Sequence, residues 1–129
     1  MVSRFGSGTP WEPVVGYSRA VRAGPFVFVA GTTATDTDGQ VAGDDGAYEQ
    51  TLRALHNLRA ALERAGAGLE DVVQTRLYVT DIEIWEEVGR AHDEVFGDIR
   101  PVTAMVEVSR LIDPRMRVEI EAVAYLGSR

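Results

Sequence analysis

The sequence contains no cysteine among its 129 residues, which excludes disulfide bonds, a thiolate nucleophile and a thiolate metal site. It also lacks an apolar run of about 18 residues, the length that a membrane-spanning helix requires. The first ten residues contain no apolar stretch of the kind found in secretory signals. We therefore expect a cytoplasmic protein that has no membrane partner.

Basic residues are in the minority. Thirteen basic residues stand against twenty acidic residues, and the net charge is −7. Proteins that bind nucleic acid gather basic side chains into patches that neutralise phosphates. The arginines of this sequence are scattered and often adjoin acidic residues, as in Glu63-Arg64. The charge pattern therefore argues against nucleic acid as the main partner.

Motifs that bind cofactors or metals are missing as well. The glycines are isolated turn residues, so they form neither a Walker motif nor a dinucleotide fingerprint. His56 and His92 are far apart in the sequence and lack the spacing of zinc ligands. The segment Gly6-Ser7-Gly8 is expected to be flexible, and it lacks the strand–turn–helix context of a nucleophilic serine. We expect no cofactor and no metal ion.

The length is typical of one domain, which we expect to span residues 1–129. Short strands are predicted at 19–22 and 26–30, with a turn at 23–25 between them. The segment 35–46 is rich in Asp, Gly and Thr and predicts a loop. Its acidic residues do not match the spacing of an EF-hand calcium loop.

Two segments show the periodicity of amphipathic helices. The first covers about 47–65, with Asp44 or Asp45 as its N-cap, Gly66 at its end and an apolar stripe of Tyr48, Leu52, Leu55, Leu58 and Leu62. The second covers about 82–96. Thr80 and Glu83 have the spacing of a capping box, and the inner stripe is Trp85, Val88, His92 and Val95. A lone histidine on such a stripe is expected to be a packing residue.

Three further segments alternate as strands. In 72–80, one face is predicted to hold Val73, Thr75, Leu77 and Val79. In 103–109, Ala104, Val106 and Val108 share a face, opposite Thr103, Met105, Glu107 and Ser109. In 117–126, Val118, Ile120, Ala122 and Ala124 share a face, opposite Glu119, Glu121, Val123 and Tyr125. The order of elements predicts an α+β fold with two helices on one face of a sheet, and the uncovered face invites self-association.

Carboxylates on the last two strands are the first candidates for chemistry. Glu119 and Glu121 alternate onto one face, and we expect Glu107 to lie beside them. A carboxylate in a partly desolvated cleft is suited to general acid or base catalysis. The alternative is that these residues are rim charges paired with Arg110, Arg115 or Arg117. The pattern names no reaction by itself.

Five segments together resemble the Rid (reactive intermediate deaminase), or YjgF, family: 14–18, 29–32, 72–81, 100–108 and 118–124. The combination of P-x-x-x-x-V-E-V with V-E-I-E-A-x-A is specific to it. The resemblance implies a chorismate-mutase-like fold with a six-stranded sheet, and a homotrimeric barrel with small-molecule sites between subunits. Deaminases of this family hydrolyse enamines and imines such as 2-aminoacrylate without a cofactor. Members are also labelled endoribonucleases, which this acidic chain does little to support.

The resemblance also assigns residues. Tyr17 matches a tyrosine near the ligand, Gly31 a glycine whose backbone approaches it, and Glu119 the catalytic carboxylate that positions water. Thr103 stands where deaminases carry the arginine that binds the substrate carboxylate, and Gly89 stands where they carry an asparagine.

The ligand is further expected to contact backbone groups near Met105, and Arg100 is a weak substitute for the missing arginine. A threonine cannot form the bidentate charged pair that arginine forms with a carboxylate. We therefore expect an arginine-lacking branch with weak or no 2-aminoacrylate deaminase activity. Two functions follow: hydrolysis of an imine, enamine or related carbonyl compound, or non-catalytic binding of a small metabolite or protein by the same trimer.

Overall fold

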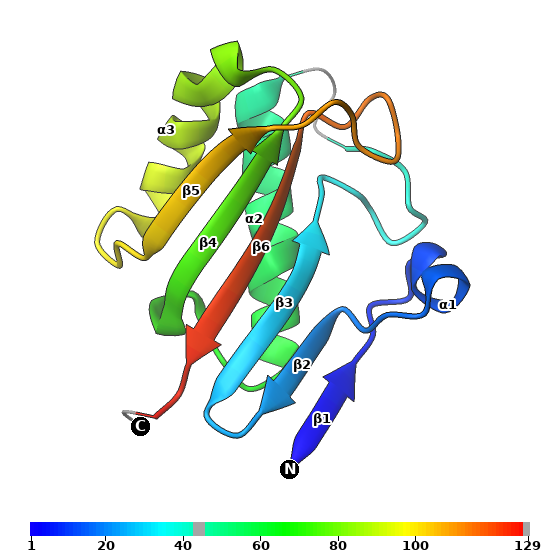
Figure 1. Cartoon of the computed structure of the whole chain (residues 1–129), viewed down its shortest axis with the longest axis vertical. Helices are drawn as coiled ribbons and strands as arrows, with labels where there is room; N and C mark the ends of the chain where they lie inside the picture. The colour runs from blue at the N-terminus through cyan, green and yellow to red at the C-terminus, as the bar shows by residue number, and fades with distance from the viewer. Residues whose placement is uncertain (43–45, 128–129) are drawn as a thin grey trace.

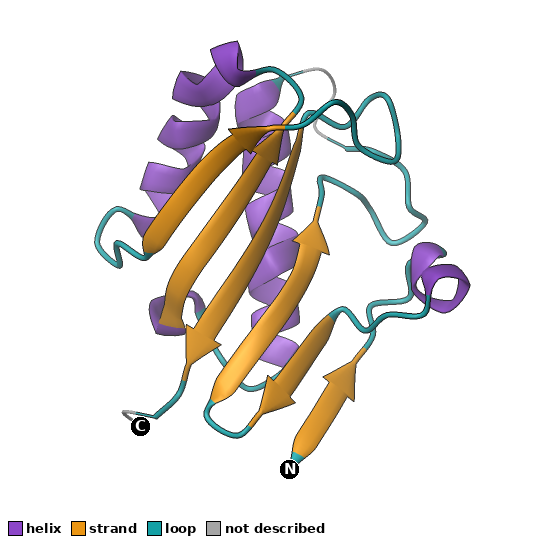
Figure 2. Cartoon of the chain, in the orientation of Figure 1, coloured by secondary structure: helices purple, strands orange, loops and turns teal. Residues whose placement is uncertain are grey.

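The computed structural model describes residues 1–42 and 46–127. Six strands form one sheet in the order β1-β2-β3-β6-β4-β5, and the two long helices cover one face of it (Figures 1 and 2). The strands are β1 (Val2–Phe5), β2 (Ala20–Ala23), β3 (Phe26–Thr32), β4 (Val72–Val79), β5 (Val102–Glu107) and β6 (Val118–Tyr125). The helices are α1 (Trp11–Val15), α2 (Ala47–Arg64) and α3 (Trp85–Phe96), with 3₁₀ turns η1 (Leu69–Asp71) and η2 (Ile82–Ile84). The predicted α+β fold with a six-stranded sheet is confirmed.

Strand β1 and helix α1 lie on either side of Gly6-Ser7-Gly8, and the sequence predicted neither of them. Strand β1 pairs antiparallel with β2, and it forms the edge of the sheet. Helix α1 ends at Gly16, whose φ of 89° is in the left-handed region that glycine adopts without steric cost. Within the stretch Gly6-Ser7-Gly8, which we expected to be flexible, the backbone amide and the hydroxyl of Ser7 donate hydrogen bonds to Glu12. Elements of four and five residues are too short to show a periodicity.

Helix α2 follows its prediction closely. Leu55, Leu58 and Leu62 are buried in the core against the sheet. Gly66, with φ of 87°, ends the helix as expected. The predicted caps Asp44 and Asp45 lie outside the described residues, and Gly46 occupies the N-cap position.

The second helical segment begins differently from its prediction. Residues 82–84 form the 3₁₀ turn η2, and the side chain of Asp81, not that of Thr80, caps it by accepting from the Glu83 amide. Trp85 is 54% exposed, so its assignment to the inner stripe is wrong. Ile84 packs against the core instead, because the tighter 3₁₀ winding shifts the inward face by one residue.

Strand β6 lies at the centre of the sheet, and its predicted alternation is confirmed: Val118, Ile120, Ala122 and Ala124 are at most 3% exposed. The alternation predicted for β4 fails at its start. The register with β6 shifts between Val72 and Gln74, so Val72 is buried and Val73 is exposed. A bulge of this kind adds one residue and reverses the alternation before it.

The two faces of strand β5 are exchanged relative to their prediction, so Glu107 lies on the face that was expected to be apolar. Thr103, Met105 and Glu107 lie directly beside Thr75, Leu77 and Val79 of β4, all three of which are buried beneath the helices. Met105 and Glu107 therefore share the helix-covered face, and Ala104 and Val106 lie on the open face. The expectation that Glu107 lies beside Glu119 and Glu121 is wrong. The alternation of β5 shows which side chains share a face, but it does not show which of the two faces the helices cover.

The open face of the sheet is apolar in part. Phe26, Phe28 and Tyr125 form a ring cluster there with centroid distances of 5.2 Å and 6.2 Å, and each of these residues is at least 39% exposed. Val106 is 46% exposed on the same face. Large apolar patches of this kind mark interaction surfaces. Among residues 1–42 and 46–127, no helix is both long enough and apolar enough to span a membrane.

Candidate functional site

A bulge in β3 brings Gly31 over Glu119. Val29 pairs with Ala122 and Thr32 pairs with Ile120, so β3 has one more residue than β6 across this interval. The extra residue turns Gly31 toward the carboxylate of Glu119. A Cβ at position 31 would lie 2.6 Å from Oε2 of Glu119, so a larger residue there would force the carboxylate to move. Glycine at this position therefore allows Glu119 to keep the position seen here.

Glu119 lies half-buried on the open face of the sheet. Burial is the main cause that raises the pKa of its carboxyl, and the negative charge of Glu121 adds to it, while Arg19 acts in the opposite direction. Within the part of the chain that the structure describes, no hydrogen bond reaches its side-chain oxygens. A carboxylate that is desolvated and unpaired is suited to accept a proton from a bound molecule.

The other two candidate carboxylates have structural partners. Glu121 accepts a hydrogen bond from the Tyr78 hydroxyl and lies 3.9 Å from a guanidinium nitrogen of Arg76. Glu107 accepts from the backbone amide of Ile82 at 2.9 Å and so fixes the start of η2. The structure therefore distinguishes Glu119 from both.

Arg19 connects the bulge to Tyr17, the tyrosine that the resemblance placed near the ligand. Its Nη1 donates to the Gly31 carbonyl at 2.6 Å and lies 3.2 Å from the Thr32 hydroxyl. Its Nη2 donates to the Tyr17 hydroxyl at 3.1 Å, and its guanidinium lies 5.4 Å from the centre of the Tyr17 ring. Arg19 thereby pairs a carbonyl at the bulge and fixes the tyrosine beside it.

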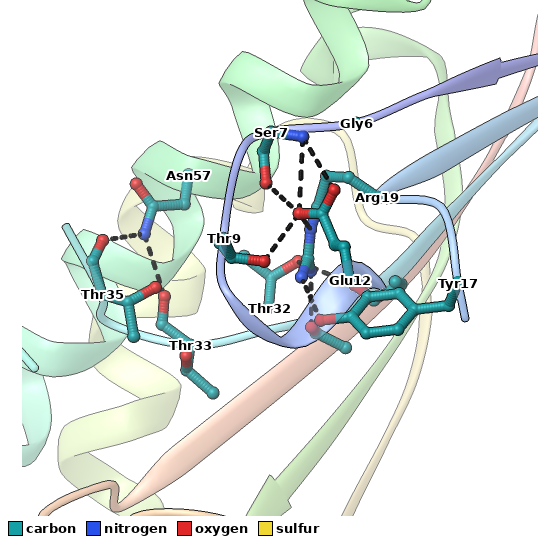
Figure 3. Close-up of polar contacts among 12 residues, drawn as sticks. Gly6, Ser7, Thr9, Glu12, Tyr17, Arg19, Thr32, Thr33, Thr35 and Asn57 are labelled. Atoms are coloured by element: carbon teal, nitrogen blue, oxygen red, sulfur yellow. Dashed lines mark hydrogen bonds and ion pairs between the residues drawn. The ribbon is translucent and has the colours of Figure 1, made fainter. Parts of the chain in front are cut away.

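Glu12 holds the far side of Arg19 (Figure 3). Its carboxylate accepts from the Ser7 and Thr9 hydroxyls at 2.5 Å and 2.7 Å and from the Ser7 amide at 3.0 Å, and lies 3.9 Å from Arg19 Nε. Burial alone would raise the pKa of Glu12, but these hydrogen bonds outweigh it and hold the pKa at about 2. Glu12 is therefore ionised at neutral pH, and its carboxylate links the N-terminal loop to Arg19.

Tyr17, Gly31 and Glu119 line one cavity of about 640 Å³. Its other walls come from the loop after β3 and from α2, including Arg53 and Asn57. The Asn57 amide fixes the loop by donating to the carbonyls of Thr33 and Thr35 at 2.9 Å and 2.7 Å, as Figure 3 shows. The three residues that the resemblance placed on this side of the site therefore lie together.

Thr103 and Arg100 line a different cavity of about 460 Å³, between α3 and the start of β5. Gly89, which the resemblance matched to an asparagine of the deaminases, lines it too. Arg100 has a φ of 56°, and its amide bonds to the Phe96 carbonyl just beyond the end of α3. Met105 lines neither cavity, because its side chain packs against the core. One chain therefore holds the predicted site residues in two separate groups.

Sequence reasoning missed Glu12 and Arg19. Their signal in the sequence is weak: a glutamate in a short segment without periodicity, and an arginine directly before the apolar start of a strand. His56, which the sequence analysis considered only as a zinc ligand, is exposed on the wall of the larger cavity.

The fold and this site define an α+β protein whose sheet presents to a cavity a carboxylate that has no hydrogen-bond partner among residues 1–42 and 46–127. A protein-family model described as "Endoribonuclease L-PSP" matches residues 9–126. A "RutC family protein" of Pyrococcus abyssi is 40% identical over 116 residues, covering 88% of this chain and 89% of the relative. The chain belongs to this family, the Rid or YjgF family, as its motifs predicted.

Solved structures agree. Rv2704 of Mycobacterium tuberculosis, described as a member of the YjgF/YER057c/UK114 family, is 53% identical and superimposes with a TM-score of 0.88, over 97% of this chain and 99% of that one. E. coli TdcF with bound serine is 25% identical, with a TM-score of 0.76 over 84% of this chain and 87% of that one. The chain has the fold of the YjgF family.

Proposed function

We propose that this chain is a Rid-family hydrolase of a small imine, enamine or related carbonyl compound, and that Glu119 is its catalytic carboxylate. The observation that supports this most strongly is the half-buried Glu119, unpaired within the described residues and facing a cavity of about 640 Å³. The small molecule bound to the related TdcF, serine, is consistent with a ligand of this size. The reaction needs no cofactor.

The chemistry follows from the geometry. Glu119 accepts a proton from a water molecule as the water oxygen attacks the carbon of the C=N bond. Returning that proton to nitrogen gives a carbinolamine, which carries a hydroxyl and an amino group on the same carbon. Glu119 then moves the proton of the new hydroxyl to the amino nitrogen, so that the C–N bond breaks, ammonia leaves and the oxygen stays on carbon as a carbonyl. Because the Tyr17 hydroxyl accepts from Arg19, its own proton is free to be donated to the ligand.

We further propose that the functional unit is a homotrimer with its sites between subunits. Two observations support it. The exposed aromatic cluster of Phe26, Phe28 and Tyr125 leaves the open face of the sheet without cover. The groups around Glu119 and around Thr103 line separate cavities of one chain, so two copies in contact can complete one site.

Thr103 sets the limit of this activity. In a desolvated site, removing an arginine that pairs with a carboxylate costs several kcal/mol of binding. We propose that hydrolysis of 2-aminoacrylate or 2-iminopropionate is slow for this reason. The non-catalytic alternative, in which the same clefts only bind a metabolite, is favoured by the same substitution.

Ammonia release from freshly generated imines tests the proposal. We expect the protein to accelerate release from an imine without a carboxylate, and Glu119→Gln to abolish the acceleration while leaving ligand-induced stabilisation in place. The matched control is Glu87→Gln, which changes an exposed glutamate of α3. Stabilisation by ligands without turnover by the unmodified protein would favour the binding alternative.

A further inference from the structure

A hydrogen-bonded triad of side chains, formed by His92, Thr75 and Thr103, leads from the interior to the surface at the start of β5. The Nε2 atom of His92 lies 2.9 Å from the Thr75 hydroxyl, and that hydroxyl lies 2.7 Å from the Thr103 hydroxyl. Thr75 is fully buried, whereas Thr103 is exposed and lines the cavity of about 460 Å³. The register of the parallel pair β4–β5 places the two threonines directly side by side.

His92, which lies at one end of this triad, is uncharged. His92 packs against the ring of Phe96 with a centroid distance of 4.8 Å. Burial lowers its pKa, and the nearby Asp93 opposes this effect. The imidazole is therefore neutral at pH 7, since its ordinary pKa already lies below that value.

A neutral triad of this type can either donate a hydrogen bond to a ligand or accept one from it. If Nε2 of His92 accepts from Thr75, then Thr75 accepts from Thr103, and the Thr103 oxygen keeps its lone pairs for a donor in the cavity. In the other tautomer, Nε2–H donates to Thr75, Thr75 donates to Thr103, and the Thr103 proton points to an acceptor. Thr103 also lies 3.3 Å from the Pro101 carbonyl, an acceptor inside the chain for that proton.

The remaining charges of the cavity are balanced: Arg100 and Asp93 both line it. The subsite therefore has one oriented hydroxyl and no net charge. A carboxylate that binds there would lose its hydration and gain one neutral hydrogen bond, so its binding free energy would be unfavourable.

We propose that His92, Thr75 and Thr103 form a specificity subsite for an uncharged polar group of the ligand, of the carboxamide, carbonyl or hydroxyl class. The proposal names the substrate class of the site described under the proposed function and in that sense rests on it. Thr103 is the residue that contacts the ligand, and Thr75 and His92 are positioning residues.

Calorimetric titration with pyruvamide and pyruvate tests this assignment, because the two probes differ only in the group that the subsite meets. We expect the unmodified protein to bind pyruvamide about tenfold more tightly than pyruvate. Thr103→Val, which replaces the hydroxyl by a methyl group of similar size, should remove most of that ratio, as expected for one lost hydrogen bond. Thr103→Ser should retain it.

The positioning role has its own readout. Thr75→Val should weaken the preference for pyruvamide while Thr103 is still present, an effect that a purely structural threonine would not produce. Equal or tighter binding of pyruvate, no binding of either probe, or a preference that Thr103→Val leaves unchanged would overturn the proposal. Pyruvate binding that is lost in Arg100→Ala would assign the subsite to Arg100 instead.

The outcome is separable from that of the proposed function. Glu119→Gln should keep the preference for pyruvamide and lose turnover. A preference that is present in a protein without Glu119-dependent turnover would support the subsite and refute the hydrolase.

Discussion

Gly31 lies so close to the carboxylate of Glu119 that a Cβ at position 31 would be 2.6 Å from Oε2 and 2.7 Å from Cδ. The β3 bulge creates this approach, and Arg19 holds the carbonyl of Gly31 on the other side. The two residues therefore form one unit, in which the backbone of the bulge fixes where the carboxylate can point.

Gly31→Ala is the direct test of this unit. The new methyl group must displace the end of a flexible side chain, so the cost in unfolding free energy should be about 1 kcal/mol, at the low end for overpacking. Turnover should fall about 100-fold, because the carboxylate moves from its working position. The control is Gly89→Ala, where the Cβ meets nothing and stability should rise by about 0.5–1 kcal/mol. Full activity in Gly31→Ala would contradict this account.

Glu119→Gln should make the protein more stable at pH 8. The raised pKa means that the folded state binds this proton more tightly than the unfolded state, so the group stabilises the fold at low pH and loses that contribution as pH rises through its folded pKa. The variant should melt at a higher temperature than the unmodified protein at pH 8, with the difference shrinking toward pH 4. A lower melting temperature at pH 8 would show that the carboxylate is paired in solution.

Glu12→Gln should have the opposite effect. The pKa of about 2 lies below the ordinary 4.5, so ionised Glu12 stabilises the fold at neutral pH and loses this contribution as pH falls from about 4.5 toward 2. Loss of its charged hydrogen bonds should cost about 2 kcal/mol at pH 7 in denaturant unfolding. The control is Glu63→Gln, since Glu63 forms an exposed pair with Arg59 on α2 that contributes little. Equal losses in both variants would refute the role of Glu12.

The open sheet face predicts an effect on assembly. Val106→Asp places a charge on an apolar position that is 46% exposed in the single chain, so the fold should persist and the proposed trimer should dissociate. Light scattering should change from about three times the 14.1 kDa chain mass toward that mass. Val14→Asp, at an exposed position of α1, is the control. An unmodified protein that is already monomeric would refute the trimer.

The sequence predicts the position and the buried face of those elements that are long enough to show a periodicity. Strand β6 is central and packs beneath the helices, so its alternation is strict; it predicted the buried face and placed Glu119 and Glu121 together on the other face. The motifs then led to the family and to Tyr17 and Gly31.

The rest depends on contacts that no local pattern encodes. The bulge at Gly31 arises from pairing between β3 and β6, which are almost ninety residues apart. The link from Glu12 to Arg19 depends on how a short helix folds back, and the face of Glu107 depends on which side of β5 the helices cover. In each case tertiary pairing, rather than propensity, decides the position of the side chain.

The central claim is that this chain retains the hydrolytic architecture of its family around Glu119, with Thr103 deciding which substrates it accepts. Ammonia release from 2-iminopropionate, compared between the unmodified protein, Thr103→Arg, and Thr103→Arg combined with Glu119→Gln, tests it most directly. We predict slow release by the unmodified protein, a gain of about 100-fold or more in Thr103→Arg from the restored charged pair, and loss of that gain in the double variant. Release by the unmodified protein as fast as by Thr103→Arg, or a gain that survives Glu119→Gln, would contradict the account.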